Sequence, residues 1–347
     1  MKILHTSDWH LGINFKGRSF EEIHKKFLNW LIDTIKKENI DILIVAGDIF
    51  DSYNPANYAL KMYHSFLAEA IKHLKHIFII AGNHDSISTL EISKDVLDAF
   101  NIHVIADVEN LDDLIFDVGE YVICAVPFLR ERFIKTTALN LSEKESELSE
   151  GIKKIYEEVY KRAKKYNKKI IATGHLSVSG AMMSDSEREI YIGKIKSISP
   201  EIFKNFDYVA LGHIHKPQKI SENIRYSGSP VPLSFSEKEE KIVLVIDEDI
   251  KEIKVPKFKE FFEISGNFDE VKEKLKKIQN PQNPPFVEIL LDENISSSKI
   301  DELRIEGVEI TAIKQKLEFR EYVLDDIDIE KLTPMNCLLY TSPSPRD

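Results

Sequence analysis

The chain has 347 residues, of which 43% are hydrophobic and 30% are charged, and its net charge is −11. This apolar content is enough for a core, and the length favours one large domain plus a smaller one. No apolar run approaches the roughly 20 residues that span a bilayer, and two cysteines cannot form a disulfide framework. A membrane protein, a coiled coil and a disordered chain are therefore excluded, and a cytoplasmic location is expected. The acidic charge argues weakly against nucleic-acid binding.

Short runs rich in Ile and Val alternate with helical patterns in the first part of the chain. The runs contain β-branched residues and end near Gly or a charged residue, which predicts strands over 42–46, 77–81, 122–126, 170–173, 208–211 and 242–246. Apolar residues at helical spacing predict helices over 20–35, 55–74 and 148–166. Ser19 and Glu22 form an expected capping box, and Asn54 is the expected N-cap of the second helix. The alternation indicates an α/β domain over residues 1–249.

The composition changes after residue 249. Lys, Glu and Asp dominate 250–332, which contains a predicted helix over 269–278 and a predicted strand over 287–291. We expect a small α+β capping domain here. Residues 333–347 have no periodicity and contain Ser-Pro-Ser-Pro, so they are interpreted as a non-native or disordered tail.

Five predicted strands end in residue types that bind metal ions. The N-terminal run ends in an Asp-x-His, and the other four end in Gly followed by Asp, Asn or His. The complete set is Asp8, His10, Asp48, Asn83, His175, His213 and His215. Ligands gather beyond the carboxyl ends of strands in α/β sheets, so we expect these side chains to converge on one site. A single strand end of this kind is more often an ordinary turn. The prediction of a metal site therefore depends on five such strand ends occurring in one chain.

The set contains imidazoles, carboxylates and one amide but no sulfur, which suits Mn²⁺, Fe²⁺, Zn²⁺ or Co²⁺. Seven ligands are too many for one ion with an open position. They suit two ions about 3.5–4 Å apart, bridged by the Asp48 carboxylate. Water held between two cations loses its proton near neutral pH, and the cations offset charge on phosphorus. The pattern therefore predicts phosphoester hydrolysis by a hydroxide bound to two metal ions.

His84 directly follows Asn83, so we expect it beside the metal site. A histidine there can protonate a leaving alkoxide or stabilise the charged transition state. It needs a hydrogen-bonded partner to orient it. Asp51, three residues after Asp48, is the expected partner, with Asp85 as the second candidate.

The motifs around these residues resemble those of the calcineurin-like metallophosphoesterases. They are Asp8-x-His10, Gly47-Asp48, Gly82-Asn83-His84-Asp85, Gly174-His175 and Gly212-His213-x-His215. Their spacing is most similar to that of the DNA double-strand-break repair nucleases of this family. The resemblance covers residues 1–240, and 241–332 by placement only. It implies a four-layer sandwich of two sheets flanked by helices.

The resemblance also implies functional assignments. One Mn²⁺ would be held by Asp8, His10, Asp48 and His215, a second by Asp48, Asn83, His175 and His213, and His84 would be the catalytic histidine. DNA ends and single strands, a second copy of the chain and a coiled-coil SMC-like ATPase are the implied partners, with association with the nucleoid. Some relatives carry His where this chain has Asp51, which leaves the balance of exonuclease and endonuclease activity open.

The loop over 12–18 follows the first motif and offers Asn14, Lys16 and Arg18 to DNA phosphates, with Phe15 as a stacking ring. An ordinary loop between a strand and a helix is an equal alternative.

The helix over 55–74 is apolar on more than one face, which favours burial against a second element. The resemblance assigns this region to a two-fold homodimer, with Tyr58, Met62 and Phe66 as candidate contacts.

A phosphatase or small-molecule phosphodiesterase on the same metal site is the main alternative function. Protein phosphatases of this superfamily have Asp-Arg after the second motif and Glu after Asn-His. This chain has Asp51-Ser52 and Asp85-Ser86 at these places. A non-catalytic scaffold would have lost metal ligands, and none is missing from the motifs. The sequence therefore predicts a Mn²⁺-dependent DNA nuclease.

Overall fold

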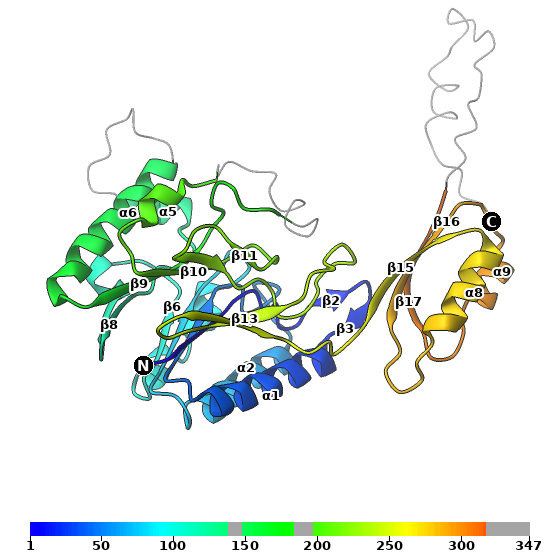
Figure 1. Ribbon diagram of the computed structural model, residues 1–347, viewed down its shortest axis with the longest axis horizontal. Coiled ribbons are helices and arrows are strands. Elements are labelled where there is room, and N and C mark those ends of the chain that lie inside the picture. The colour runs from blue at the N-terminus through cyan, green and yellow to red at the C-terminus, as the bar shows by residue number, and fades with distance from the viewer. Residues whose placement is uncertain (138–147, 184–196, 317–347) are drawn as a thin grey trace, which may run out of the picture.

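The computed structural model describes residues 1–137, 148–183 and 197–316, so the expected tail lies outside the described residues. Within these ranges the chain forms two six-stranded sheets, a three-stranded sheet and a two-stranded hairpin. The large sheets stack on one another with helices on both outer faces, and the three-stranded sheet lies to the right (Figure 1). This confirms the predicted α/β sandwich. None of the helices in these ranges is long and apolar enough to cross a membrane.

The first sheet has the strand order β14-β13-β1-β4-β5-β6. Its strands are β1 (Ile3–Thr6), β4 (Ile42–Ala46), β5 (His76–Ile80), β6 (Ile102–Ile105), β13 (Ile242–Ile246) and β14 (Ile250–Lys254). The strands β1, β4, β5 and β6 run parallel, whereas β13 and β14 are antiparallel to their neighbours. Parallel strands covered on both faces are continuous apolar runs, which is why the sequence shows them clearly. Strand β14 extends this sheet past the predicted domain boundary at residue 249.

Two helices, α1 (Glu21–Glu38) and α2 (Asn57–Ala70), cover the outer face of the first sheet. The predicted capping box is wrong. The N-cap of α1 is Phe20, and the Ser19 hydroxyl accepts a hydrogen bond from the Glu21 N–H at 3.2 Å. Helix α2 also begins after its predicted start, with Ala56 as the N-cap. The short helices α3 (Ile87–Glu91) and α4 (Lys94–Asp98) precede β6.

The second sheet has the strand order β11-β12-β10-β9-β8-β7. Its strands are β7 (Ile115–Val118), β8 (Tyr121–Cys124), β9 (Lys169–His175), β10 (Tyr208–Gly212), β11 (Gln218–Lys219) and β12 (Ile224–Tyr226). Helices α5 (Glu131–Thr137) and α6 (Leu148–Ala163) lie on its outer face (Figure 1). The short 3₁₀ helices are η1 (Leu111–Leu114), η3 (Lys164–Tyr166) and η4 (Pro200–Phe203).

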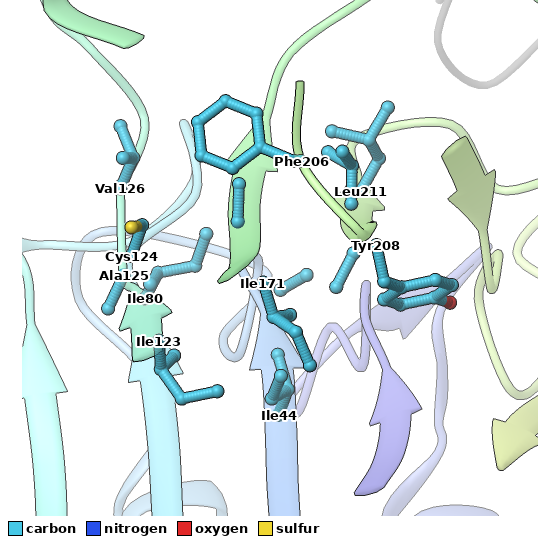
Figure 2. Close-up of a cluster of buried hydrophobic side chains, with 14 of the residues drawn as sticks. Ile44, Ile80, Ile123, Cys124, Ala125, Val126, Ile171, Phe206, Tyr208 and Leu211 are labelled. Atoms are coloured by element: carbon cyan, nitrogen blue, oxygen red, sulfur yellow. The ribbon is translucent and has the colours of Figure 1, made fainter. Parts of the chain in front are cut away.

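Alternate residues of the central strands divide between two apolar layers, because successive side chains of a strand point to opposite faces. In β4, Ile44 faces the second sheet, whereas Leu43 packs with residues of α1 and α2. Figure 2 shows Ile44 in the layer between the sheets, with Ile123 and Ile171 of the second sheet. Burying such side chains stabilises the fold by about 1.5–3 kcal/mol each.

The third unit consists of β15 (Phe261–Gly266), α8 (Phe268–Ile278), β16 (Phe286–Leu291), α9 (Ser297–Glu302) and β17 (Glu309–Gln315). Its three strands are parallel, with β16 in the centre, and they alternate with the helices. The predicted helix and strand of this region are both present. An apolar layer between the sheet and its helices forms a separate core, which includes Val271, Leu275 and Ile289.

Candidate metal centre and active site

The predicted metal ligands lie at the carboxyl ends of five strands. Those of the first sheet follow β1, β4 and β5, and those of the second sheet end β9 or follow β10. In this order they are Asp8, His10, Asp48, Asn83, His175, His213 and His215. The two sheets therefore bring their ligands to one edge of the sandwich.

Two groups of three side chains have possible ligand atoms within 4.8 Å of one another. One is Asp8, His10 and His215, and the other is Asp8, Asp48 and His175. The Asp48 Oδ2 lies 3.2 Å from His175 Nε2 and 3.6 Å from His10 Nε2. Asp8 is common to both groups, and this Asp48 oxygen lies between one imidazole of each group.

Asn83 and His213 belong to the same cluster. The Asn83 Oδ1 lies 3.1 Å from His175 Nε2 and 2.9 Å from His213 Nδ1. The backbone N–H of His213 also donates to Asp8 Oδ1 at 2.9 Å. All seven predicted ligands are thus brought together.

The cluster has polar groups that a cation would satisfy. His10 Nε2 is buried and has no hydrogen-bond partner among the residues that the structure describes. An unsatisfied buried group of this kind costs about 1–3 kcal/mol. Asp8 and Asp48 beside it are also buried. Imidazole and carboxylate donors suit a divalent cation, which would coordinate this nitrogen and offset both negative charges. The residues therefore fit a divalent metal site.

The charges within the cluster also determine where protons bind. Burial acts to lower the pKa of His175, but the Asp48 carboxylate outweighs it and raises this pKa to about 9. Burial acts in the same way on His10, and Asp51 and Asp48 raise its pKa to about 9. Burial would raise the pKa of Asp48, yet the neighbouring histidines hold it well below its usual range. Protons thus occupy positions that a cation would take, so metal binding must release them.

The backbone at the site adopts conformations that L-residues rarely use. Four of the ligand residues lie in the left-handed region: Asp8 (φ 53°), His10 (φ 46°), Asp48 (φ 50°) and His213 (φ 93°). Such residues cost roughly 1–3 kcal/mol each and cluster at functional sites. A glycine is needed at position 82, which lies against Asp48 in the fold, because a Cβ atom at Gly82 would overlap Asp48.

His84 lies beside the cluster, with its ring centroid 5.0 Å from that of His10. Its Nδ1 donates to the backbone carbonyl of Asp51 at 2.9 Å, and its N–H donates to Asp48 Oδ1 at 2.9 Å. The predicted partner is therefore present, but it acts through its main chain. The Asp51 carboxylate instead lies 3.3 Å from His10 Nδ1. The second candidate, Asp85, is buried and accepts backbone N–H groups.

A cavity of about 450 Å³ opens beside this cluster. Its lining includes His10, Asp51, His84 and His215, and also Glu263, Glu288 and Lys314 of the third unit. The remaining lining residues are Ile13, Phe15, Lys16 and the segment 233–236. The third unit therefore borders the cavity beside the cluster.

The candidate DNA contacts of the loop over 12–18 have different environments. Asn14 and Arg18, in the hairpin of β2 (Asn14–Phe15) and β3 (Arg18–Ser19), are exposed. Lys16 lines the cavity and forms an ion pair with Glu288 of the third unit. Phe15 cannot serve as a stacking ring, because it is only 6% exposed. It contacts Phe20, Phe235, Phe261 and Phe286, which join the hairpin to the third unit.

The candidate dimer contacts on α2 also separate into two kinds. Phe66 is 4% exposed and packs edge-to-face against Trp9, with ring centroids 5.2 Å apart, so it belongs to the core of its own chain. Tyr58 and Met62 are partly exposed and line a groove between α1 and α2. Phe66 also borders this groove, so its expected role in a dimer stays a prediction although most of its side chain is buried.

The sequence analysis did not single out Glu237, whose carboxylate Oε1 lies 3.4 Å from His215 Nδ1. The residue sits in the run SEKEEK, which hydropathy places on the surface. Its side chain is nevertheless fully buried. Only the tertiary fold, which brings this segment against His215, reveals the contact.

Comparisons with known proteins agree with these motifs. The family model described as calcineurin-like phosphoesterase matches residues 1–217. The SbcD subunit of the nuclease SbcCD from Escherichia coli K12 is 37% identical over 361 residues, covering 97% of this chain and 90% of the relative. The protein of the same name from Staphylococcus epidermidis is 31% identical over 305 residues, covering 82% and 77%. The chain therefore belongs to the calcineurin-like phosphoesterase family.

Proposed function

We propose that this protein is a DNA nuclease of double-strand-break repair that hydrolyses phosphodiester bonds with two Mn²⁺ per chain. The observation that supports this most is the convergence of seven donor side chains, two of which, His10 and His215, line a cavity of about 450 Å³. The relative from Escherichia coli K12, which is 37% identical over 97% of this chain, is named as a subunit of a nuclease.

In this proposal one ion is held by Asp8, His10 and His215, the other by Asn83, His175 and His213, with Asp48 between them. The position of Asp48 Oδ2 between His10 and His175 supports the bridging role. When bound, two divalent cations lower the pKa of water and offset the charge that develops on the phosphate.

His84 is the proposed catalytic histidine. Because the Asp51 carbonyl accepts from Nδ1, the ring is held in one orientation and Nε2 is left for the substrate. We propose that His84 stabilises the transferring phosphoryl group or passes a proton to the leaving oxygen. This role requires only that the ring borders the cavity, as it does.

DNA phosphates would enter along the wall formed by the hairpin and the third unit. Asn14, Lys16 and Arg18 are the proposed contacts, and Lys314 of the third unit adds a further cation to the cavity lining. Contacts of this kind position a nucleic acid without reading its sequence.

We further propose a homodimer and a coiled-coil SMC-like ATPase partner, in the cytoplasm near the nucleoid. Each of these relatives is named as a subunit of SbcCD, which supports an assembly of several chains. The groove lined by Tyr58 and Met62 supports a dimer through α2.

The experiment that tests the function measures Mn²⁺-dependent cleavage of end-labelled single- and double-stranded DNA. p-Nitrophenyl phosphate and its bis ester are assayed alongside. We expect DNA cleavage that His213→Ala abolishes and that His73→Ala, a change at an exposed histidine, leaves unchanged. Turnover of the small esters alone would instead indicate a phosphatase or a small-molecule phosphodiesterase.

A further inference from the structure

The segment 227–241 between β12 and β13 contacts one of the proposed metal ligands, His215. It contains a buried ion pair between Glu237 and Lys241, whose side chains are 0% and 6% exposed. Glu and Lys are almost never fully buried unless they are paired. The proposed function does not use this pair.

Both oxygens of the Glu237 carboxylate have partners. Oε1 lies 3.4 Å from His215 Nδ1, and Oε2 lies 2.5 Å from the Lys241 ammonium. Oε2 also accepts the backbone N–H of Leu233 at 3.2 Å. The carboxylate therefore joins the ring of a metal ligand to a buried cation.

Lys241 contacts the main chain of the same histidine, His215. Its ammonium donates to the backbone carbonyl of His215 at 3.1 Å and to the Ser229 hydroxyl at 2.9 Å. The ion pair thus contacts both the ring and the main chain of His215. The positions of the His215 ring and backbone are fixed together.

We propose that Glu237 is a positioning residue for His215, acting through its contact with Nδ1, and that Lys241 is the counter-ion that makes this possible. By accepting from Nδ1, the carboxylate fixes the tautomer in which Nε2 is the ligand atom, a common arrangement around metal-bound histidines. The inference rests on the proposed role of His215 in the metal centre.

Stability alone does not account for this pair. Replacing a buried ion pair by well-packed apolar residues is often neutral or stabilising, because desolvation of the two charges is costly. The geometry instead points to His215, because Oε1 faces His215 Nδ1 while Oε2 pairs with Lys241. An acceptor oxygen held next to the ring nitrogen of a metal ligand is what a positioning role requires.

The test is calorimetric titration of Mn²⁺ into the metal-depleted full chain, with DNA absent. We expect Glu237→Gln to weaken one of two binding events by roughly 10- to 100-fold, the range found when such outer partners are removed. Glu240→Gln is the matched control, since Glu240 lies in the same segment and pairs with exposed Lys254. It is expected to bind Mn²⁺ as the parent does.

Three further variants separate positioning from folding. His215→Ala should lose the same binding event, and adding Glu237→Gln to it should cause no further loss. Glu237→Leu with Lys241→Met replaces the ion pair by apolar groups, so thermal stability without metal should recover while Mn²⁺ affinity does not.

Several outcomes would overturn the inference. Unchanged Mn²⁺ affinity in Glu237→Gln, or affinity that recovers together with stability in the double variant, would show that the pair is structural. If the parent chain itself binds no Mn²⁺, the proposed metal centre fails and this inference fails with it. Normal binding by the parent with no effect of Glu237→Gln would leave the proposed function intact.

Discussion

At the scale of single residues, Asp51 performs two separable tasks. Its carbonyl oxygen orients His84, and its carboxylate contacts His10 Nδ1. Sequence spacing identified the residue but could not show which of its groups makes which contact. The distinction matters because a substitution removes the carboxylate and keeps the carbonyl.

We therefore expect His84→Ala and Asp51→Ala to differ. His84→Ala removes the proposed catalytic group and should lower kcat for DNA cleavage by roughly 10²- to 10⁴-fold, with Mn²⁺ affinity unchanged. Asp51→Ala should instead weaken Mn²⁺ binding through His10 and lose little kcat at saturating Mn²⁺. Single-turnover cleavage at increasing Mn²⁺ concentrations measures both. Equal losses of kcat at saturating metal would mean that the Asp51 carboxylate is itself needed for the chemistry.

At the scale of elements, prediction succeeded where the local sequence carries the whole signal. Strands β4 and β13 are covered on both faces, so their uninterrupted apolar runs gave their bounds. The convergence of the seven candidate ligands was predictable for a related reason, because each follows such a run. Helix starts failed because the N-cap of α1 is Phe20, which carries no capping group. The inward orientation of Phe15 and Glu237 depends on segments distant in sequence, which no local pattern contains.

One connection between the two sheets predicts an acid-sensitive fold. His5 of β1 lies 2.9 Å from the Tyr208 hydroxyl and 3.2 Å from the Leu211 carbonyl, both in β10. Burial lowers its pKa to about 3, although the hydrogen bond to Leu211 opposes this. The ordinary pKa of an unfolded histidine is about 6.5. As the pH falls, His5 of the unfolded chain binds a proton before His5 of the folded chain does. The contribution of neutral His5 to the free energy of unfolding is therefore complete above about pH 6.5 and is lost as the pH falls towards 3.

We expect the free energy of unfolding in urea to decrease from pH 7 to pH 4.5, and His5→Phe to reduce that slope. The aromatic substitution keeps most of the volume but cannot bind a proton. His73→Phe, at an exposed histidine in the turn after α2, is the control and should change the slope less than His5→Phe does. A slope that is identical in the parent and His5→Phe would assign the acid sensitivity to other groups, such as buried His24.

At the scale of the whole molecule, the third unit is joined to the sandwich by packing and by charge. Five phenylalanine rings from the hairpin region, the 233–236 segment and the third unit contact one another: Phe15, Phe20, Phe235, Phe261 and Phe286. Lys16 and Lys314 both pair with Glu288 at the edge of the cavity. The two units thus form the cavity together, and the position of the third unit sets its width.

The proposed homodimer gives a prediction at the same scale. Met62→Asp places a charge in the groove between α1 and α2, where a second copy would have to bury it, so the chain should become monomeric. Sedimentation velocity of the parent and the variant measures this. Lys164→Asp, in η3 on the opposite helical layer, should leave the mass unchanged. A parent that is monomeric at all concentrations would exclude the dimer.

The aromatic contacts predict that a substitution in the third unit lowers activity on a large substrate, DNA, more than activity on a small ester. Phe286→Ala removes a ring that contacts Phe15, Phe20 and Phe261, and losses of about 3–5 kcal/mol are usual for such core changes. The third unit should loosen, while the proposed metal ligands, which come from the other two sheets, stay in place. We expect kcat/KM for DNA to fall more than tenfold and turnover of the bis(p-nitrophenyl) ester to change little.

Phe203→Ala is the matched control for that comparison, because Phe203 is fully buried beneath α6, far in the chain from the third unit, and packs against Tyr156. It should destabilise the fold to a similar degree while the ratio of the two activities stays that of the parent. If Phe286→Ala lowers both activities in parallel, the third unit supports the metal centre itself. If it lowers neither, the wall of the cavity does not contribute to DNA binding. A selective loss for DNA is the outcome that follows from a cavity whose chemistry comes from the sandwich and whose shape comes from the third unit.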